Sequence, residues 1–337
     1  MIGGNPHLQG TEVISMINLT DPVTESHIEL CYILFFGRYP ENVDVVKQHI
    51  ENVTSVKDLG KYFSSSAEYR SRNGVGTAIR PLEWKGVRTD VIVEDSELAR
   101  MISHVEADWN ILGTAEPHWS VLTHEKYKSE SIEKNIDDFY FSGKRTLDYF
   151  ESAVSRSGIA LKNNAVCFEL GCGVGRITVW LADKFEKVIA ADISSAHLAI
   201  ASEVFAERKF SNVKPQLLQK VADIDLIEEF DVFISVIVLQ HNPPPVIHAI
   251  LSSVFKRLRP GGVAYFQAPT YSTNSFVAAI YLNKLEDKGK MEVHAIPQRL
   301  IFDLAKKHGL NILDIREDGW TGSDRFVSNS ILLHKPL

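Results

Sequence analysis

The stretch Glu169-Leu170-Gly171-Cys172-Gly173-Val174-Gly175-Arg176 indicates the fold of this chain. It lies between the apolar run 166–170, which predicts a short strand, and residues 177–185, which predict a helix. Gly171 and Gly173 permit a tight turn and let a ligand approach bare backbone. The helix that follows offers free N–H groups to a polar or anionic group. We therefore predict a ligand-binding turn; the alternative is that the glycines serve only the geometry of the chain.

The spacing of the glycines indicates which ligand to expect. A dinucleotide fingerprint has glycines at its first, third and sixth positions. Here the third glycine stands at the fifth position and Arg176 at the sixth, which disfavours NAD and FAD. Asp192 ends the next predicted strand, 21 residues after Gly171, where an acid can accept both hydroxyls of a ribose. A ligand with this ribose but no pyrophosphate fits both observations, so we predict S-adenosylmethionine as cofactor and S-adenosylhomocysteine as its product.

The rest of the C-terminal half alternates predicted strands and helices. The further strands are expected at residues 187–191, 213–218, 231–236, 263–268, 311–316 and 326–334, and the helices at 195–209, 243–258 and 297–308. This alternation predicts an α/β protein with a parallel, doubly wound sheet.

Three motifs give this region a family resemblance. Glu169-x-Gly171-x-Gly173-x-Gly175 with Asp192 is followed by Phe230-Asp231 and then by Leu258-x-Pro260-Gly261-Gly262. Together they resemble the class I S-adenosylmethionine-dependent methyltransferases over residues 165–337. The resemblance implies a seven-stranded Rossmann-like sheet whose last strand runs antiparallel.

The resemblance also implies cofactor-binding roles. The residues implied at the methionine part of the cofactor are those of the turn, Gly171, Cys172, Gly173 and Gly175. Glu169 would support the turn and orient the ammonium group through water, Asp192 would hold the ribose, and Ile193 would flank the adenine. The family often has an acid near the end of the third strand, at the adenine. This chain has Gln219 there, with Asp223 a few residues later, so we expect Gln219 at the adenine.

The acceptor is expected at the carboxyl ends of the strands, where Gln240 and His241 follow the predicted fourth strand. An imidazole with an ordinary pKa of ~6.5 suits a general base at neutral pH. We predict His241 as that base and Gln240 as an acceptor-binding residue; a histidine that only caps the next helix is the alternative.

The residues after His241 bear on the acceptor class. Asn242-Pro243-Pro244 resembles the Asn-Pro-Pro-aromatic motif of methyltransferases that act on amino groups of bases and glutamine. However, Pro245 occupies the aromatic position, and Asn242 lies 11 residues after Asp231, further than that motif allows. A hydroxyl acceptor is therefore favoured.

A long segment, residues 269–297, follows the predicted fifth strand, and long loops in compact domains are usually functional. Residues 276–285 predict a helix of the kind a lid would contain. His294 is a second candidate for the base or a substrate ligand, and Tyr271 a candidate for binding substrate through its hydroxyl. A surface position without a role is the alternative for His294.

We divide the chain into a helical module (1–100), an aromatic-rich connector (101–163) and the methyltransferase-like domain (164–337). In class I enzymes the segment before the first strand often folds over the cofactor. Trp119 and Tyr140 are therefore expected as lid residues of the cofactor site. The stretch 73–77 predicts a loop.

The helical module has its own resemblance. Residues 28–36 predict a helix that begins after Thr24 and ends at Gly37. Tyr32-Ile33-Leu34-Phe35-Phe36-Gly37-Arg38-Tyr39-Pro40 and Tyr62-Phe63-Ser64-Ser65-Ser66-Ala67-Glu68-Tyr69 resemble a helical family of unknown function. That family is often fused to bacterial glycosyltransferases and methyltransferases that act on surface glycans. The match covers residues 24–72 and implies a context, not a mechanism.

Composition excludes several other classes. The chain has 337 residues, with 36 Lys and Arg against 43 Asp and Glu, a formal charge of −7, which disfavours a nucleic-acid partner. Its 3 cysteines match no metal-site spacing, so no metal is expected, and they indicate a reducing, cytoplasmic compartment. The N-terminus does not read as a signal peptide, and the longest apolar run, 30–36, falls far short of the ~20 residues that span a bilayer.

From the sequence we therefore expect a methyltransferase that methylates a hydroxyl of a sugar or surface-glycan precursor. One alternative is a small-molecule or lipid O-methyltransferase with the same chemistry. Another is a scaffold that binds cofactor without turnover while residues 1–100 recruit a protein partner. A third, an NAD enzyme, is disfavoured by the glycine spacing.

Overall fold

A computed structural model describes residues 19–66, 68–69, 87–286 and 288–337. The chain divides into two compact units, Met1–Ile79 and Arg80–Leu337. The sequence-based boundary after residue 100 differs from this division, because it falls inside the helix α5 (Asp95–Ala115). The predicted loop at 73–77 lies outside the described residues.

The first unit is helical. It contains α1 (Glu25–Cys31), the π-helical segment η2 (Tyr32–Phe36), α2 (Val43–Asn52) and α3 (Val56–Ser64). The predicted start after Thr24 and end at Gly37 are both observed, and Gly37 takes the left-handed conformation with φ of 67°. Ile28 and Phe63 are almost fully buried in its core.

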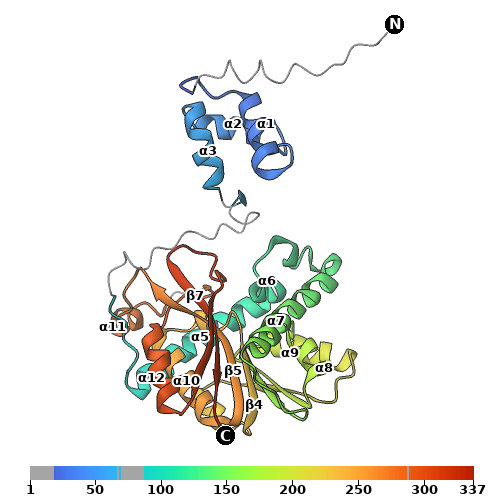
Figure 1. The fold of residues 1–337 in the computed structure, drawn as a ribbon, viewed down its shortest axis with the longest axis vertical. Helices are drawn as coiled ribbons and strands as arrows, with labels where there is room; N and C mark the ends of the chain where they lie inside the picture. The colour runs from blue at the N-terminus through green and yellow to red at the C-terminus, as the bar shows by residue number, and fades with distance from the viewer. Residues whose placement is uncertain (1–18, 67, 70–86, 287) are drawn as a thin grey trace. The chain divides into compact units, whose positions relative to one another are not determined.

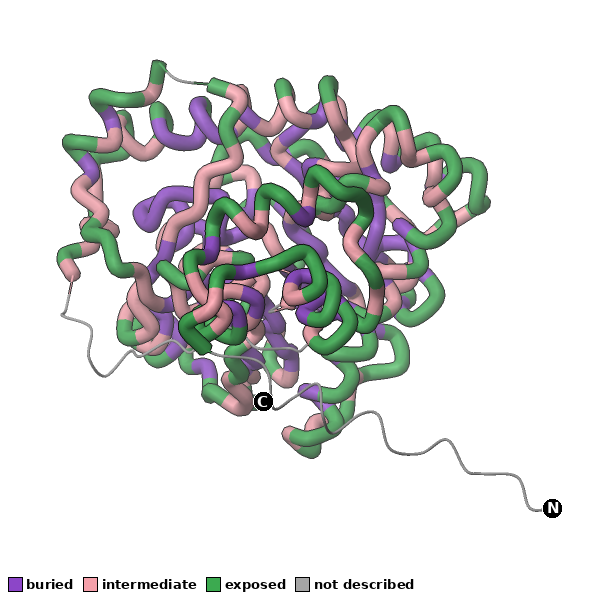
Figure 2. Tube along the Cα trace, turned by 90° about the horizontal axis from the view of Figure 1, so that it is seen from above, coloured by how far each residue is buried: buried purple, intermediate pink, exposed green. Residues whose placement is uncertain are grey.

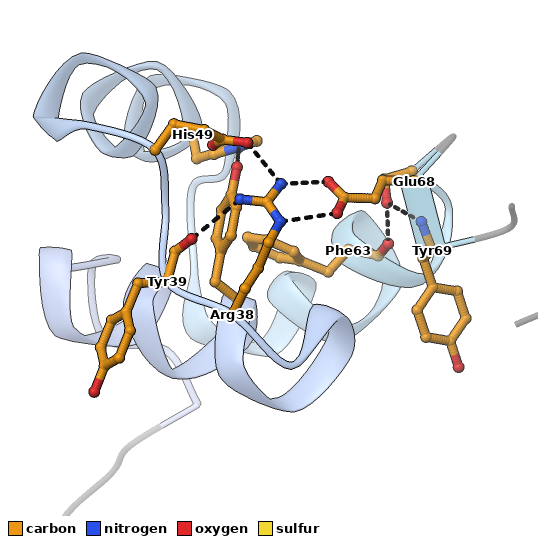
Figure 3. A network of polar contacts seen from close by, with 9 residues as sticks. Arg38, Tyr39, His49, Phe63, Glu68 and Tyr69 are labelled. Atoms are coloured by element: carbon orange, nitrogen blue, oxygen red, sulfur yellow. Dashed lines mark hydrogen bonds and ion pairs between the residues drawn. The ribbon is translucent and has the colours of Figure 1, made fainter. Parts of the chain in front are cut away.

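An ion pair joins the two segments that carry the resemblance of this unit (Figure 3). Arg38 Nε and Nη2 donate to the two carboxylate oxygens of Glu68 at 3.0 and 2.7 Å, and Nη1 donates to the Tyr39 carbonyl at 3.0 Å. Glu41 lies 2.7 Å from Arg38 Nη2. Because bidentate pairs fix geometry as well as charge, Arg38 and Glu68 hold these two segments together.

The second unit is built on a seven-stranded sheet. Its strands are β1 (Val166–Leu170), β2 (Lys187–Asp192), β3 (Val213–Leu217), β4 (Phe230–Ser235), β5 (Leu258–Ser272), β6 (Asn311–Glu317) and β7 (Phe326–His334). Their order is β3-β2-β1-β4-β5-β7-β6, and β7 runs antiparallel to both of its neighbours. The Rossmann-like methyltransferase sheet expected from the sequence is thereby confirmed. β5 extends beyond its predicted range at both ends.

Helices cover both faces of the sheet (Figure 1). They are α6 (Pro117–Val121), α7 (Ile136–Arg156), α8 (Thr178–Lys184), α9 (Ser195–Glu207), α10 (Pro244–Arg257), α11 (Ala278–Leu282) and α12 (Gln298–Lys307), with short 3-10 turns at Glu125–Tyr127, Ile132–Lys134, Val221–Leu226 and Leu239–His241. Successive side chains of β4 point to opposite faces of the sheet. Val232 packs on the face covered by α7 and α8, and Phe233 packs on the face covered by α10 and α12. The predicted helix at 276–285 is limited to α11.

Burial follows this layering (Figure 2). Every residue of β4 is buried, whereas the edge strand β3 is largely exposed and tolerates Pro215. The three cysteines are unpaired and buried. No helix in the described ranges has the length and apolar character needed to cross a bilayer.

We expect Gly143→Ala to destabilise the second unit. A Cβ at Gly143, in α7, would lie 2.0 Å from the Arg176 carbonyl oxygen, so the helix and the glycine turn must move apart. Overpacking of this kind costs about 1–3 kcal/mol, which chemical denaturation measures. Ser152→Ala, at an exposed position of the same helix, is the matched control. Equal stabilities of the two variants would contradict this close approach.

Candidate functional site

A cavity lies at the carboxyl ends of β1, β2 and β4, beneath α5 and α6. The lining residues that define it are Val105, Trp109, Ser120, Val121, Leu170, Gly171, Cys172, Gly173, Arg176, Asp192, Ile193, His197, Leu218, Val236, Ile237, Val238 and Asn242, among others. This is the edge where an open α/β sheet binds its ligands.

The glycine turn forms the floor of the cavity. Gly171 and Gly173 have φ of 77° and 55°, and a Cβ at either position would lie 2.2 Å from Val238 or 2.5 Å from Val121. Gly175 also has positive φ, but a Cβ there would meet Phe205, and Gly175 does not line the cavity. Two glycines of the motif therefore serve ligand approach, and the third serves helix packing.

Asp192 ties the turn to the second strand. Its Oδ2 accepts from Gly173 N at 2.8 Å and its Oδ1 from Ser194 N at 2.9 Å. The carboxylate is buried and lines the cavity, and its binding of a ribose stays a prediction.

Two buried charged groups flank the turn with unused hydrogen-bonding atoms. Glu169 Oε2 accepts from Thr178 Oγ1 at 2.6 Å, while Oε1 has no partner, and burial raises the pKa of Glu169 to about 7. Arg176 lines the cavity; Nη1 donates to Ser142 Oγ at 3.3 Å, Nε has no partner, and burial lowers the pKa of Arg176 to about 10.

Arg176 lines the cavity, and its orphaned guanidinium N–H suits the carboxylate of an amino-acid head group. Glu169 does not line the cavity, so its orphaned carboxylate oxygen suits an ammonium group only through a bridging water. The site therefore fits S-adenosylmethionine. The sequence analysis treated Arg176 only as a departure from the dinucleotide pattern and did not predict it at the site. The feature that could have indicated it is a positively charged residue directly after the glycine turn.

Next to Asp192 the wall of the cavity is apolar. Ile193 and Leu218 line it, and contact of Ile193 with an adenine stays a prediction. Gln219 does not line the cavity; its side chain donates to Glu106 Oε1 at 2.7 Å, and its backbone N–H donates to Asp223 Oδ2. Asp223 caps the 3-10 turn at 221–226, which turns Gln219 outward.

The connector covers the cavity with other residues than those predicted. Neither Trp119 nor Tyr140 is among the lining residues. Tyr140 is buried beside the turn, where its hydroxyl donates to the Val174 carbonyl at 3.1 Å, and burial raises its pKa to about 12. Trp109 and Val121 line the cavity instead. The spacing of Val105 and Trp109, one helical turn apart in α5, could have predicted that both side chains lie on the same face of that helix.

His241 belongs to a buried hydrogen-bond network beside the cavity. Its Nδ1 lies 2.7 Å from the Glu292 carbonyl oxygen, which can only accept, so Nδ1 carries the proton. Nε2 then accepts from the Gln240 amide at 3.1 Å, so neither nitrogen is free. Burial lowers the pKa of His241 to about 4. The His241 ring packs 5.1 Å from the cavity-lining Trp109 and does not itself line the cavity.

Gln240 and Gln267 extend this network to the wall of the cavity. The Gln267 amide donates to Gln240 Oε1 at 2.9 Å and to Ser328 Oγ at 2.7 Å. Its oxygen accepts from Ile237 N at 3.0 Å, and Ile237 has a φ of 60°, rare for a β-branched residue. Gln240 is thus a member of a buried amide chain and is not positioned at the cavity surface.

The segment after β5 carries a second histidine. His294 Nε2 lies 2.9 Å from Glu292 Oε2, and this hydrogen bond lowers the pKa of Glu292. His294 packs edge-on against Phe276 and Tyr281 and, like His241, does not line the cavity. Tyr271 lies in β5 opposite Val327 and does not line the cavity. No group of three His, Cys, Asp or Glu side chains suited to a metal occurs in the described ranges.

Comparison with known proteins identifies the class. Residues 168–262 match a family model described as a methyltransferase domain, which agrees with the class I S-adenosylmethionine-dependent methyltransferase expected from the sequence. The NAD and scaffold alternatives are therefore set aside.

Relatives are similar to this chain over about half of its length. The ubiquinone biosynthesis O-methyltransferase of Pseudomonas fluorescens (strain SBW25) is 26% identical over 175 residues, covering 51% of this chain and 71% of the relative. A carboxy-S-adenosyl-L-methionine synthase of Alteromonas mediterranea is 23% identical over 200 residues, covering 52% and 81%. The magnesium protoporphyrin IX methyltransferase from Synechocystis PCC 6803 with bound S-adenosylhomocysteine superposes with a TM-score of 0.48 at 16% identity, covering 69% of this chain and 99% of that structure.

We expect cofactor affinity to rise with pH through the pKa of Glu169. Below about 7 this carboxyl is protonated in the free protein and offers no charge to an ammonium group, whereas above 7 it is ionised. Binding of S-adenosylhomocysteine, which has the same head group, should be about tenfold tighter at pH 8 than at pH 6 by calorimetry. Glu169→Gln should weaken binding and remove this pH dependence. An unchanged slope in that variant would exclude Glu169 as its source.

Proposed function

We propose that this enzyme methylates a hydroxyl oxygen, with a sugar or glycan precursor as the first acceptor class. S-adenosylmethionine supplies a methyl group on a sulfonium centre, whose departure as a neutral thioether makes the carbon electrophilic. In this proposal Arg176 binds the carboxylate of the cofactor, Glu169 orients its ammonium group through water, and Asp192 accepts from the ribose hydroxyls. Positioning by these groups provides a large part of the acceleration.

The observation that carries the choice of oxygen is the His294–Glu292 pair. A hydroxyl loses its proton on methylation, so a nearby base assists. With Nε2 hydrogen-bonded to the Glu292 carboxylate, His294 Nδ1 is the nitrogen that accepts a proton. His241 is the weaker candidate, because both of its nitrogens are engaged and burial holds its pKa at about 4.

Two acceptor classes remain in competition. The helical module favours a saccharide, through its resemblance to proteins fused to glycan-modifying enzymes. The relatives favour a small-molecule or lipid hydroxyl, since several are ubiquinone biosynthesis O-methyltransferases. In either case we propose that residues 1–100 recruit a protein partner. We also propose that the Tyr271 hydroxyl binds the acceptor only if the segment after β5 rearranges around it.

An acceptor screen tests the proposal directly. Radiolabelled methyl transfer from S-adenosylmethionine is measured with nucleotide sugars, glycan fragments, hydroxyl-bearing small molecules and lipids, and primary amines as acceptors. Alkali-stable label in a sugar supports the glycan assignment, and label in a small-molecule or lipid hydroxyl supports the alternative. Incorporation only into amines would contradict O-methylation.

With an acceptor in hand, we expect His294→Ala to lower kcat by about 10²–10⁴ and to leave cofactor affinity unchanged. His241→Ala should cost less than about tenfold in kcat and keep the shape of the pH–rate profile, while lowering stability because Gln240 and the Glu292 carbonyl lose a partner. The reverse pattern, with His241→Ala inactive but folded, would assign the base to His241.

A further inference from the structure

A second cavity, of about 370 Å³, lies between α7 and the β6–β7 end of the sheet, away from the cofactor site. Its lining residues are Tyr149, Arg156, Tyr265, Asp314, Arg316, Glu317, Asp318, Trp320, Ser330 and Leu332. Tyr265, Leu332 and Asp314 are in register across β5, β7 and β6, so their side chains share one face of the sheet. None of these residues takes part in the cofactor site.

Two aromatic rings form one wall of this groove. The Tyr149 and Trp320 rings lie 5.9 Å apart at an interplanar angle of 40°, and Tyr149 is 37% exposed. The indole N–H of Trp320 donates to no group within the described ranges. The wall therefore combines an apolar surface with an unused donor.

Acidic and basic side chains form the other walls of the groove. Asp314 is neutralised by Arg156, 2.5 Å from its Oδ2, with Arg316 at 3.4 Å. Asp318 accepts from Trp320 N at 3.0 Å and from Ser330 Oγ at 2.9 Å, and it has no cationic partner among the described residues. Burial raises the pKa of Asp318.

These features restrict the ligand. The groove has three carboxylates and two guanidinium groups, and this excess of negative charge disfavours a phosphate or another anion. The same charged side chains disfavour an apolar lipid chain, because binding it would remove them from water. The two arginines disfavour a free cation. A pyranose ring has an apolar C–H face for the aromatic wall and hydroxyls that both donate and accept, so it matches the remaining groups.

We propose that the groove between α7 and β6 is a binding site for a neutral saccharide unit, with Trp320 as its platform and Asp318 as an acceptor of hydroxyl hydrogen bonds. The site is separate from the cofactor cavity and does not require the methylated acceptor to be a sugar.

Saturation-transfer NMR with the full chain tests this, using the methyl glycosides of glucose, galactose, mannose and N-acetylglucosamine as probes. At least one should bind with a Kd of about 1 mM, typical of a single shallow subsite. Trp320→Ala and Asp318→Asn should each weaken that binding at least tenfold. An asparagine at 318 can still accept from Trp320 N through its oxygen, and its N–H can donate to Ser330 Oγ in place of the hydrogen bond that Asp318 accepts there, so this variant controls for misfolding.

Phe141→Ala is the matched control. It removes an exposed aromatic side chain of α7, the helix that carries Tyr149, but Phe141 does not line the groove, so sugar binding should be unchanged. Binding of S-adenosylhomocysteine should be unchanged in all three variants, which separates this result from a failure of the proposed function. The proposal is overturned if no probe binds, or if binding survives in both groove variants.

Discussion

The Asp192 carboxylate is the interaction on which the cofactor site depends. One oxygen holds the glycine turn after β1 and the other holds the start of α9, so two neighbouring strand ends are fixed relative to each other. Parallel strands bring these ends to one edge, where the Gly171 and Cys172 N–H groups donate to the Ala191 carbonyl at 2.7 and 3.0 Å. The Asp192 carboxylate adds the link to the next N–H group of the turn and to the start of α9, so these backbone N–H groups are satisfied. The orphaned atoms of Glu169 and Arg176 are held beside this bridge.

Much of this arrangement follows from local sequence. The glycine turn, the strand that precedes it and the acid 21 residues later are set by short-range patterns, and the order of strands follows from the resemblance. What could not be predicted depends on where side chains point after packing. Tyr140 and Trp109 are both aromatic residues of the connector, yet the α7 register buries Tyr140 beside Val174 and the α5 register brings Trp109 to the cavity.

The same distinction explains the histidines. His241 was predicted directly after β4, and it lies in the 3-10 turn that follows this strand. Its hydrogen bond to Glu292 joins residues 51 apart in the chain, and no local pattern indicates such a contact. Gln219 shows the converse: its position at the end of β3 was predicted, but an interaction with Glu106, 113 residues away, decides its orientation.

Ile237 shows what the buried amide chain achieves. A β-branched residue in the left-handed region costs on the order of 1–2 kcal/mol, and Gln267 offsets this by accepting its N–H. Because Gln267 is fully buried and hydrogen-bonded on all sides, this wall of the cavity has little freedom to relax. The end of β4 is therefore preorganised. Its backbone conformation is set when the protein folds, so ligand binding does not have to reduce the conformational entropy of this segment.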